Sequence, residues 1–193
     1  NAAVKADSIY VNEDPTEQQN YDQAVQNANA IINEQQATLD PNIINTATNS
    51  VNQSKQALHG DVKLQNDKDR AKQTVSQLPH LNDAQKHMED TLIDNETTRT
   101  AVNNDLTEAQ ALDQLMAELQ DSIADKNNTL ASSQFINAEP NKKQAYTDAI
   151  QNAENIINGL INPTINKGNV SQATQAVTTA KQALDGVERL AED

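Results

Sequence analysis

Hydrophobic residues recur at helical spacing along the whole chain. From Asn169 onward they are three or four positions apart, which places them on one face of a helix: Val170, Ala173, Val177, Ala180, Leu184, Val187 and Ala191. Similar stripes begin near Tyr21, Ile44, Leu112 and Tyr146. No segment alternates between apolar and polar residues for long enough to indicate a strand. The pattern therefore predicts an all-α protein.

The five prolines mark the boundaries of these helices. Pro15 and Pro140 stand just before helical stripes, where the fixed φ angle of proline suits the first turn. Pro41 and Pro163 fall in loops between helices, and Pro79 breaks the middle section. We therefore expect one helix from about residue 16 and its equivalent from about residue 141.

The middle section contains a helix-start signal and then a long uninterrupted stripe. The run Asn82 to Gln85 is a variant of the capping box, which predicts a short helix over Asp83–Ile93. Residues 98–125 contain no helix breaker and predict one helix of roughly 28 residues, about 40 Å long. We expect its first half to serve a middle bundle and its second half the last bundle.

Two interpretations of the glycines remain open. The helix that includes Ile43 either continues through Gly60 toward Leu78, at a cost of about 1 kcal/mol for an internal glycine, or ends there. In the second case Gly60 and Gly186 are helix C-caps followed by a hinge.

The chain contains an internal repeat with an offset of about 125 residues. Residues 8–15 match residues 133–140, and after a one-residue slip residues 55–58 match residues 181–184. All four aromatic residues fall in the repeat as two equivalent pairs, Tyr10 with Phe135 and Tyr21 with Tyr146. Our predicted core is Tyr10, Tyr21, Ile31, Leu58, Leu112, Met116, Phe135, Tyr146, Ile150, Ile157, Val177 and Leu184.

The first copy of the repeat lacks one helix of the second. The stripe of Leu112–Ile123 precedes the second copy, and its counterpart would lie before Asn1. The apolar faces of the helices of Tyr21 and Val51 would then be bare. We expect either a two-helix remnant there or intermolecular packing.

Composition and charge exclude several classes of protein. The chain has 193 residues, 14 Lys and Arg against 28 Asp and Glu, a formal charge of −14, no Cys, and 2% aromatic residues. So few aromatics favour several small cores in series. The acidic charge argues against nucleic-acid partners. No apolar run approaches the roughly 20 residues of a membrane span, and no signal peptide opens the chain, so we expect any targeting or anchoring segment to lie outside it.

Candidate chemistry is sparse. No third metal ligand recurs around His59, His80 and His87 in the sequence. Pro79 and the Asn82 cap place His80 in a loop. We therefore predict no metal site. Acidic pairs such as Glu89 with Asp90 and Asp121 with Asp125 are expected from composition alone. No phosphate-binding or nucleophile motif occurs. We assign no catalytic, cofactor-binding or metal-binding residue, and the ligand-binding residues remain unknown.

Several runs of residues carry a family resemblance. Residues 112–119, Ser133 with Phe135, Pro140 with Ala145–Tyr146, and the closing run 180–186 resemble the FIVAR module. Residues 78–86 followed by 97–102 resemble a GA-type three-helix module. Their alternation is similar to that of the giant staphylococcal extracellular matrix-binding surface proteins.

The resemblance implies an elongated rod of consecutive three-helix bundles joined by long shared helices. It implies a truncated FIVAR-type module over 1–60, a GA-type module over 61–101 whose third helix runs on to about 125, and a complete FIVAR-type module over 102–193.

The same resemblance implies a non-enzymatic adhesin repeat at the bacterial cell wall, without a cofactor, that binds host fibronectin through weak multivalent contacts and contributes to biofilm. A structural spacer of the cell envelope is the alternative. GA modules elsewhere bind serum albumin through a helix with neighbouring tyrosines, whereas the middle module here has no aromatic residue. The resemblance therefore favours fibronectin over albumin.

Overall fold

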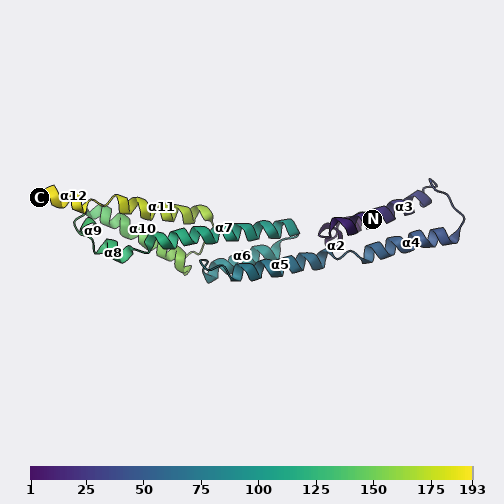
Figure 1. The fold of residues 1–193 in the computed structure, drawn as a ribbon, viewed down its shortest axis with the longest axis horizontal. Helices are drawn as coiled ribbons and strands as arrows, with labels where there is room; N and C mark the ends of the chain where they lie inside the picture. The colour runs from purple at the N-terminus through teal and green to yellow at the C-terminus, as the bar shows by residue number, and fades with distance from the viewer. Residues whose placement is uncertain (193) are drawn as a thin grey trace. The chain divides into compact units, whose positions relative to one another are not determined.

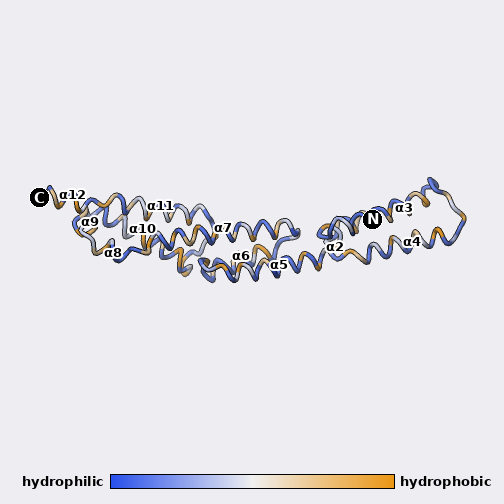
Figure 2. Tube along the Cα trace, viewed as in Figure 1, coloured by the Kyte–Doolittle hydropathy of each residue, from blue (hydrophilic) through white to orange (hydrophobic). Residues whose placement is uncertain are grey.

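The computed structural model describes residues 1–192 and is helical over that range, without a strand (Figure 1). This confirms the all-α prediction. In order, the helices are α1 (Ala2–Ala6), α2 (Ser8–Val11), α3 (Pro15–Ile32), α4 (Pro41–Gln56), α5 (Gly60–Ser76), α6 (Asp83–Asn95), α7 (Arg99–Ile123), α8 (Lys126–Leu130), α9 (Ser133–Ile136), α10 (Pro140–Asn158), α11 (Lys167–Gln182) and α12 (Gly186–Glu192). Figure 2 shows hydrophobic residues at short intervals along a mostly hydrophilic trace.

The chain forms two compact units. Unit 1 comprises Asn1–Ala71 and Asn95–Asn103, and unit 2 comprises Lys72–Asp94 and the chain from Asn104 onward. Helices α5 and α7 each contribute residues to both units. The long helix predicted over 98–125 is therefore present as α7, with 25 residues.

Unit 2 has one continuous hydrophobic core. Helices α10 and α11 lie side by side, and the second half of α7 contributes to the same cluster (Figure 1). Its members include Leu112, Met116, Tyr146, Ile150, Val177 and Leu184. The predicted role of the second half of α7 in the last bundle is thus confirmed.

The aromatic residues that are equivalent in the repeat make the same contact in both copies, which was not predicted from the sequence. The rings of Tyr10 and Tyr21 meet edge to face with centroids 6.2 Å apart, and those of Phe135 and Tyr146 do so at 5.9 Å. Such edge-to-face pairs are favourable beyond the area they bury. Of the predicted core, Tyr21 and Leu58 are also buried, whereas the structure leaves four members only partly buried: Tyr10, Ile31, Phe135 and Ile157.

The predicted capping box starts α6. The backbone N–H of Gln85 donates to Asn82 Oδ1 at 2.9 Å, and the backbone N–H of Asn82 donates to Gln85 Oε1 at 3.1 Å. Asn82 also donates from Nδ2 to the carbonyls of Ile156 and Ile157, near the end of α10. Gly159, at φ 65°, lies so close to Asn82 that a side chain would collide with it. This contact joins the start of α6 to the end of α10.

Both interpretations of Gly60 and Gly186 were wrong. Helix α4 ends at Gln56 and α5 begins at Gly60 itself, just as α12 begins at Gly186. A Cβ atom at Gly60 would lie 2.5 Å from the backbone N of Glu13 and the carbonyl O of Ser8. At Gly186 it would collide with the carbonyl of Ser133. Glycine is needed at both positions because the start of α5 lies against the backbone of α2 and the start of α12 lies against the backbone of α9.

Unit 1 contains the expected two-helix arrangement. Helices α3 and α4 lie side by side, and a groove of about 440 Å³ between them is lined by Ala24, Ile31, Ile43 and Ala47 among others. Ile32, Ile43 and Ile44 are exposed. In unit 2 the equivalent helices are covered by the second half of α7, whereas no helix of the described residues covers α3 and α4 in this way.

Replacing Tyr146 tests the core of unit 2. Tyr146→Ala removes a fully buried ring, so we expect a loss of about 3 kcal/mol or more in unfolding free energy. Tyr146→Phe should maintain or raise stability, because Tyr146 Oη is buried with no hydrogen-bond partner among the described residues. Urea unfolding followed by circular dichroism measures both. An unchanged transition in Tyr146→Ala would remove this residue from the core.

Adding a methyl group at Gly186 tests the close approach at the start of α12. We expect Gly186→Ala to destabilise the protein, because the methyl group collides with backbone that cannot move independently. Gly168→Ala is the matched control, since the nearest atom there is the side-chain Asn166 Oδ1 at 3.0 Å. Thermal unfolding should show a lower transition temperature for Gly186→Ala than for Gly168→Ala, and equal temperatures would contradict the packing argument.

Candidate functional site

The densest polar cluster of unit 1 lies where the segment between α2 and α3 meets the start of α5 and the start of α7. We call it the clasp, and its members are Asn12, Glu13, Asp14, Lys63, Asp67 and Arg99. Asn12 is buried and accepts at Oδ1 from the backbone N–H of Arg99 at 3.0 Å. It also donates from Nδ2 to the carbonyl of Thr97 at 3.0 Å. The clasp thus holds the chain before α7 against the end of α2.

Glu13 is the buried centre of the clasp. Its carboxylate accepts hydrogen bonds from the backbone N–H of His59 at 2.6 Å, from the backbone N–H of Asp14 at 2.7 Å, and from Lys63 Nζ. Burial raises the pKa of Glu13, but the hydrogen bonds from Lys63, His59 and Asp14 outweigh it and hold the pKa below its ordinary value. The ionised carboxylate caps the start of α5.

Asp14 links the two cations of the clasp. Lys63 Nζ lies 2.7 Å from Asp14 Oδ2, and Arg99 donates to Asp14 Oδ1 at 2.9 Å and to Asp67 Oδ2 at 2.6 Å. The hydrogen bonds from Lys63 and Arg99 lower the pKa of Asp14. An open pocket of about 720 Å³ adjoins these side chains.

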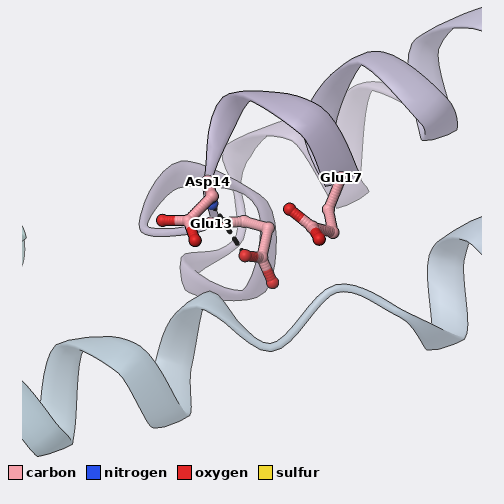
Figure 3. Close-up of side chains that lie close together, drawn as sticks. All are labelled: Glu13, Asp14 and Glu17. Carbon is pink, nitrogen blue, oxygen red and sulfur yellow. Dashed lines mark hydrogen bonds between the residues drawn. The ribbon is translucent and has the colours of Figure 1, made fainter.

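Three carboxylates of this region satisfy the distance test for a metal cluster. Oxygens of Glu13, Asp14 and Glu17 lie within 4.8 Å of one another, and Figure 3 shows Asp14 turned away from Glu17 with Glu13 between them. However, Lys63 and Arg99 already supply the positive charge, and the Glu13 oxygens already accept hydrogen bonds. The donor set therefore fits an ion-pair network, and we assign it a structural role.

The second copy builds the same junction with exchanged residues. Ala138 takes the position of Glu13, and Asp185 takes that of His59. Here Asp185 Oδ1 accepts from the backbone N–H of Glu139 at 3.1 Å, and Asp185 also pairs with Lys142 at 2.7 Å. Arg189, the equivalent of Lys63, pairs with Glu139 at 2.8 Å. In the first copy the carboxylate comes from Glu13, before α3, and in the second it comes from Asp185, before α12. Both carboxylates accept a hydrogen bond from the backbone N–H at the start of the long helix, α3 or α10.

The histidines lie in three separate environments. His80 is in the predicted loop, with its backbone N–H donating to Asp113 Oδ1 at 2.7 Å and its Nδ1 lying 2.8 Å from Gln120 Oε1. His59 and His87 are exposed. No metal-type cluster among residues 1–192 includes a histidine.

Two acidic pairs were attributed to composition alone, and one of them, Glu89 with Asp90, contains a buried carboxylate. Asp125 forms an ion pair with Lys181 and Asp121 is exposed. Glu89, in contrast, is 3% exposed on the inner face of α6. Only its position four residues after buried Gln85 and four before Ile93 could have indicated this burial.

Large apolar side chains are exposed at the tips of both copies. In the loop between α10 and α11, Leu160 is 85% exposed and Ile161 is 60% exposed. In the loop between α3 and α4, Leu39 is 98% exposed, and Ile32 at the end of α3 is 73% exposed. Exposed apolar side chains of this kind are candidates for contact with a partner. No helix of the described residues is long and apolar enough to cross a membrane.

Comparison with protein families identifies two modules. The FIVAR domain model matches residues 1–59 and 115–185, and the GA module model matches residues 61–115. The junction near residue 60 that separates the two matches is the one held by the clasp.

Comparison with individual proteins gives matches along the whole chain. It is 77% identical over 193 residues to the extracellular matrix-binding protein ebh of Staphylococcus aureus strain MRSA252, and it spans about 2% of that relative's length.

Among solved structures, a crystal structure of the 756–1003 domain of EbhA from S. aureus is 36% identical. It has a TM-score of 0.91, with 99% of this chain and 76% of that chain covered.

A second structure, from work on Embp-mediated adherence of Staphylococcus epidermidis to fibronectin, is 33% identical. Its TM-score is 0.61, with 64% of this chain and 98% of that chain covered.

The buried carboxylate at the centre of the clasp gives a test of the site. Glu13→Gln should lower the unfolding free energy by about 1.5–3 kcal/mol at pH 7, because charge-assisted hydrogen bonds are lost. The lowered pKa of Glu13 means that its contribution is present above its ordinary value of 4.5 and is lost as the pH falls. The difference between wild type and variant should therefore shrink in acid.

Glu17→Gln is the matched control, since the Glu17 carboxylate makes no hydrogen bond or ion pair within the described part of the chain. Urea unfolding at pH 7 and at pH 3 separates the two variants. Equal effects of Glu13→Gln and Glu17→Gln would contradict the role of the clasp.

Proposed function

This chain belongs to the family of FIVAR and GA modules found in staphylococcal extracellular matrix-binding proteins, and on that premise we propose that it is a surface-adhesin repeat that binds host fibronectin. The family is one of matrix-binding adhesins and not of enzymes. The relatives are extracellular matrix-binding proteins by name, and we place this chain at the bacterial cell wall.

The observation that carries the proposal is the likeness to the Embp structure, which is connected with adherence to fibronectin and is 33% identical to this chain. Its TM-score of 0.61 is well above the level of chance likeness. The relatives of this chain carry the description extracellular matrix-binding, which supports a matrix partner in general. Fibronectin is the specific partner we infer.

The mode of binding we propose is weak and multivalent. The chain spans about 2% of the length of its S. aureus relative, so many comparable modules can act together. Linking weak sites along one chain raises the overall avidity by about two orders of magnitude, through effective concentration. A single repeat therefore does not need high affinity to contribute to adhesion.

The modules we propose follow the expected division: a FIVAR-type module over 1–60, a GA-type module over 61–101 with its third helix running on to about 125, and a FIVAR-type module over 102–193. We propose the exposed tip of Leu160 and Ile161 as the first surface to map, because large apolar side chains exposed together are candidates for contact with a partner. Serum albumin ranks below fibronectin, since α6 presents no aromatic residue.

A spacer of the cell envelope is the second candidate, and the repeated junction favours it. Lys63 pairs with Asp14 at the start of α5, and Arg189 pairs with Glu139 at the start of α12. A glycine lets each of these helix starts lie against the backbone of the short helix α2 or α9. A module whose main task is to maintain a defined connection would need such junctions whether or not it binds a ligand.

Surface plasmon resonance with immobilised human fibronectin tests the proposal, with serum albumin in a parallel channel. We expect saturable binding to fibronectin that is weak for one segment and at least about tenfold stronger for a tandem duplicate. The double variant Leu160→Ser, Ile161→Ser should weaken binding if the tip is used, and the matched control is Val11→Ser, an apolar residue exposed in unit 1.

Absence of binding by both the single and the tandem protein, each shown to be helical by circular dichroism, would overturn the adhesin proposal and favour the spacer. Equal loss of binding in the tip variant and in Val11→Ser would remove the tip from consideration while leaving the partner in place.

A further inference from the structure

The inner face of α6 contains a buried acid. Gln85, Glu89 and Ile93 of α6, with Leu81 just before it, are spaced by four residues and are all buried. The side chain of Gln85 is satisfied, because its Nε2 donates to the carbonyl of Thr164 at 2.9 Å and its Oε1 accepts from Asn82. Glu89 is 3% exposed, and its carboxylate makes no hydrogen bond or ion pair with any described residue. A buried carboxylate without a partner is costly only when it is ionised.

The charges that act on Glu89 are all negative. Asp105 and Glu108 approach from α7, and Asp90 is the next residue on α6. Burial, followed by repulsion from Asp105, Glu108 and Asp90, raises the pKa of Glu89 from 4.5 to about 7. The geometry and the charges thus both favour the protonated form.

The cations near this cluster are engaged with other carboxylates. Lys72 of α5 pairs with Asp94 at 2.7 Å, and Lys167 of α11 pairs with Glu108 at 2.5 Å. His87, on α6 itself, acts on Asp90 and is exposed. Burial raises the pKa of Asp90, although Lys72 opposes that rise. No nearby positive charge is therefore directed at Glu89.

A metal ion does not fit as the partner of this carboxylate. Within residues 1–192, the test for three carboxylate or histidine ligands within 4.8 Å is met at Glu13, Asp14 and Glu17 and not around Glu89. A proton needs only one carboxylate. The chemistry that matches a single buried acid among like charges is proton uptake.

We propose that Glu89 makes the packing of α6 against α7 responsive to pH, with α6 held tightly while the side chain carries a proton and loosened when it ionises. Unit 2 contains the whole arrangement, from α6 to the facing part of α7. The part of α7 beyond Glu108 also packs with α10 and α11. The loosening we propose concerns the part of α6 around Glu89, because the start of α6 is tied to the end of α10 by the contacts of Asn82.

The direction of the pH dependence follows from the raised pKa. A group whose pKa is higher in the folded state contributes stability that is fully present below its unfolded value, here about 4.5, and is lost as the pH rises through about 7. The GA-type segment is therefore most stable in mild acid. The carboxylates that have lowered pKa values, such as Glu13, act in the opposite direction.

Hydrogen exchange of the α6 amides in the full chain, read by mass spectrometry at pH 5, 6, 7 and 8 and corrected for intrinsic rates, tests the proposal. We expect protection in α6 to fall at least about tenfold from pH 5 to pH 8 in the wild type. Glu89→Gln should remove this trend. Glu118→Gln, an exposed glutamate on α7, is the matched control and should keep it.

Two outcomes would overturn the proposal: α6 protection that does not change with pH in the wild type, or a Glu89→Gln variant that retains the wild-type trend. His87→Gln should also retain the trend, and its loss there would assign the effect to the histidine instead. If Glu89→Gln does not fold, a carbon-13 titration of the Glu89 carboxyl in the wild type decides. A midpoint near 7 supports the proposal, and one near 4.5 contradicts it.

Discussion

Burial of an aromatic pair among helices is the constraint on which this structure depends. A chain with one Phe and three Tyr must place each ring where it covers the most apolar surface, and both copies do so with an edge-to-face pair. In unit 2, the second half of α7 completes the enclosure of Tyr146. In unit 1, the same pair forms without such a helix, and apolar residues of α3 and α4 remain exposed. The second half of α7 therefore completes the core of the second copy.

Polar contacts set how one module leads into the next. The start of α5 and the start of α12 are each held by a carboxylate, a cation and a glycine without room for a side chain. The carboxylate comes from Glu13 in one copy and from Asp185 in the other. Such an exchange is possible because the junction needs one ionised acceptor near exposed backbone N–H groups, and either side of the junction can supply it. A defined connection of this kind suits both an adhesin and a spacer.

The same cores leave little room for catalysis and favour binding at the surface. Small bundles enclose few polar groups, and where a polar group is enclosed it is either satisfied, as Gln85 is, or alters stability, as we propose for Glu89. Among the exposed large apolar residues, Leu39, Leu160 and Ile161 lie in the loops between paired helices, and others lie on the helices themselves. Repetition of weak sites along a much longer protein would then provide the strength of adhesion.

The amino-acid sequence alone determined the helical class, the repeat, the capping box at Asn82, the long helix α7 and most of the core, because these features depend on local spacing and on residues close together in the chain. Only the tertiary structure decided that α5 starts at Gly60, because this requires the backbone of residues 8–13 to lie against it. It likewise decided that Glu13 is the centre of an ion-pair network and that Glu89 is buried. A pattern of neighbouring acids cannot reveal burial, since the cost of a buried charge depends on side chains that other helices bring to it.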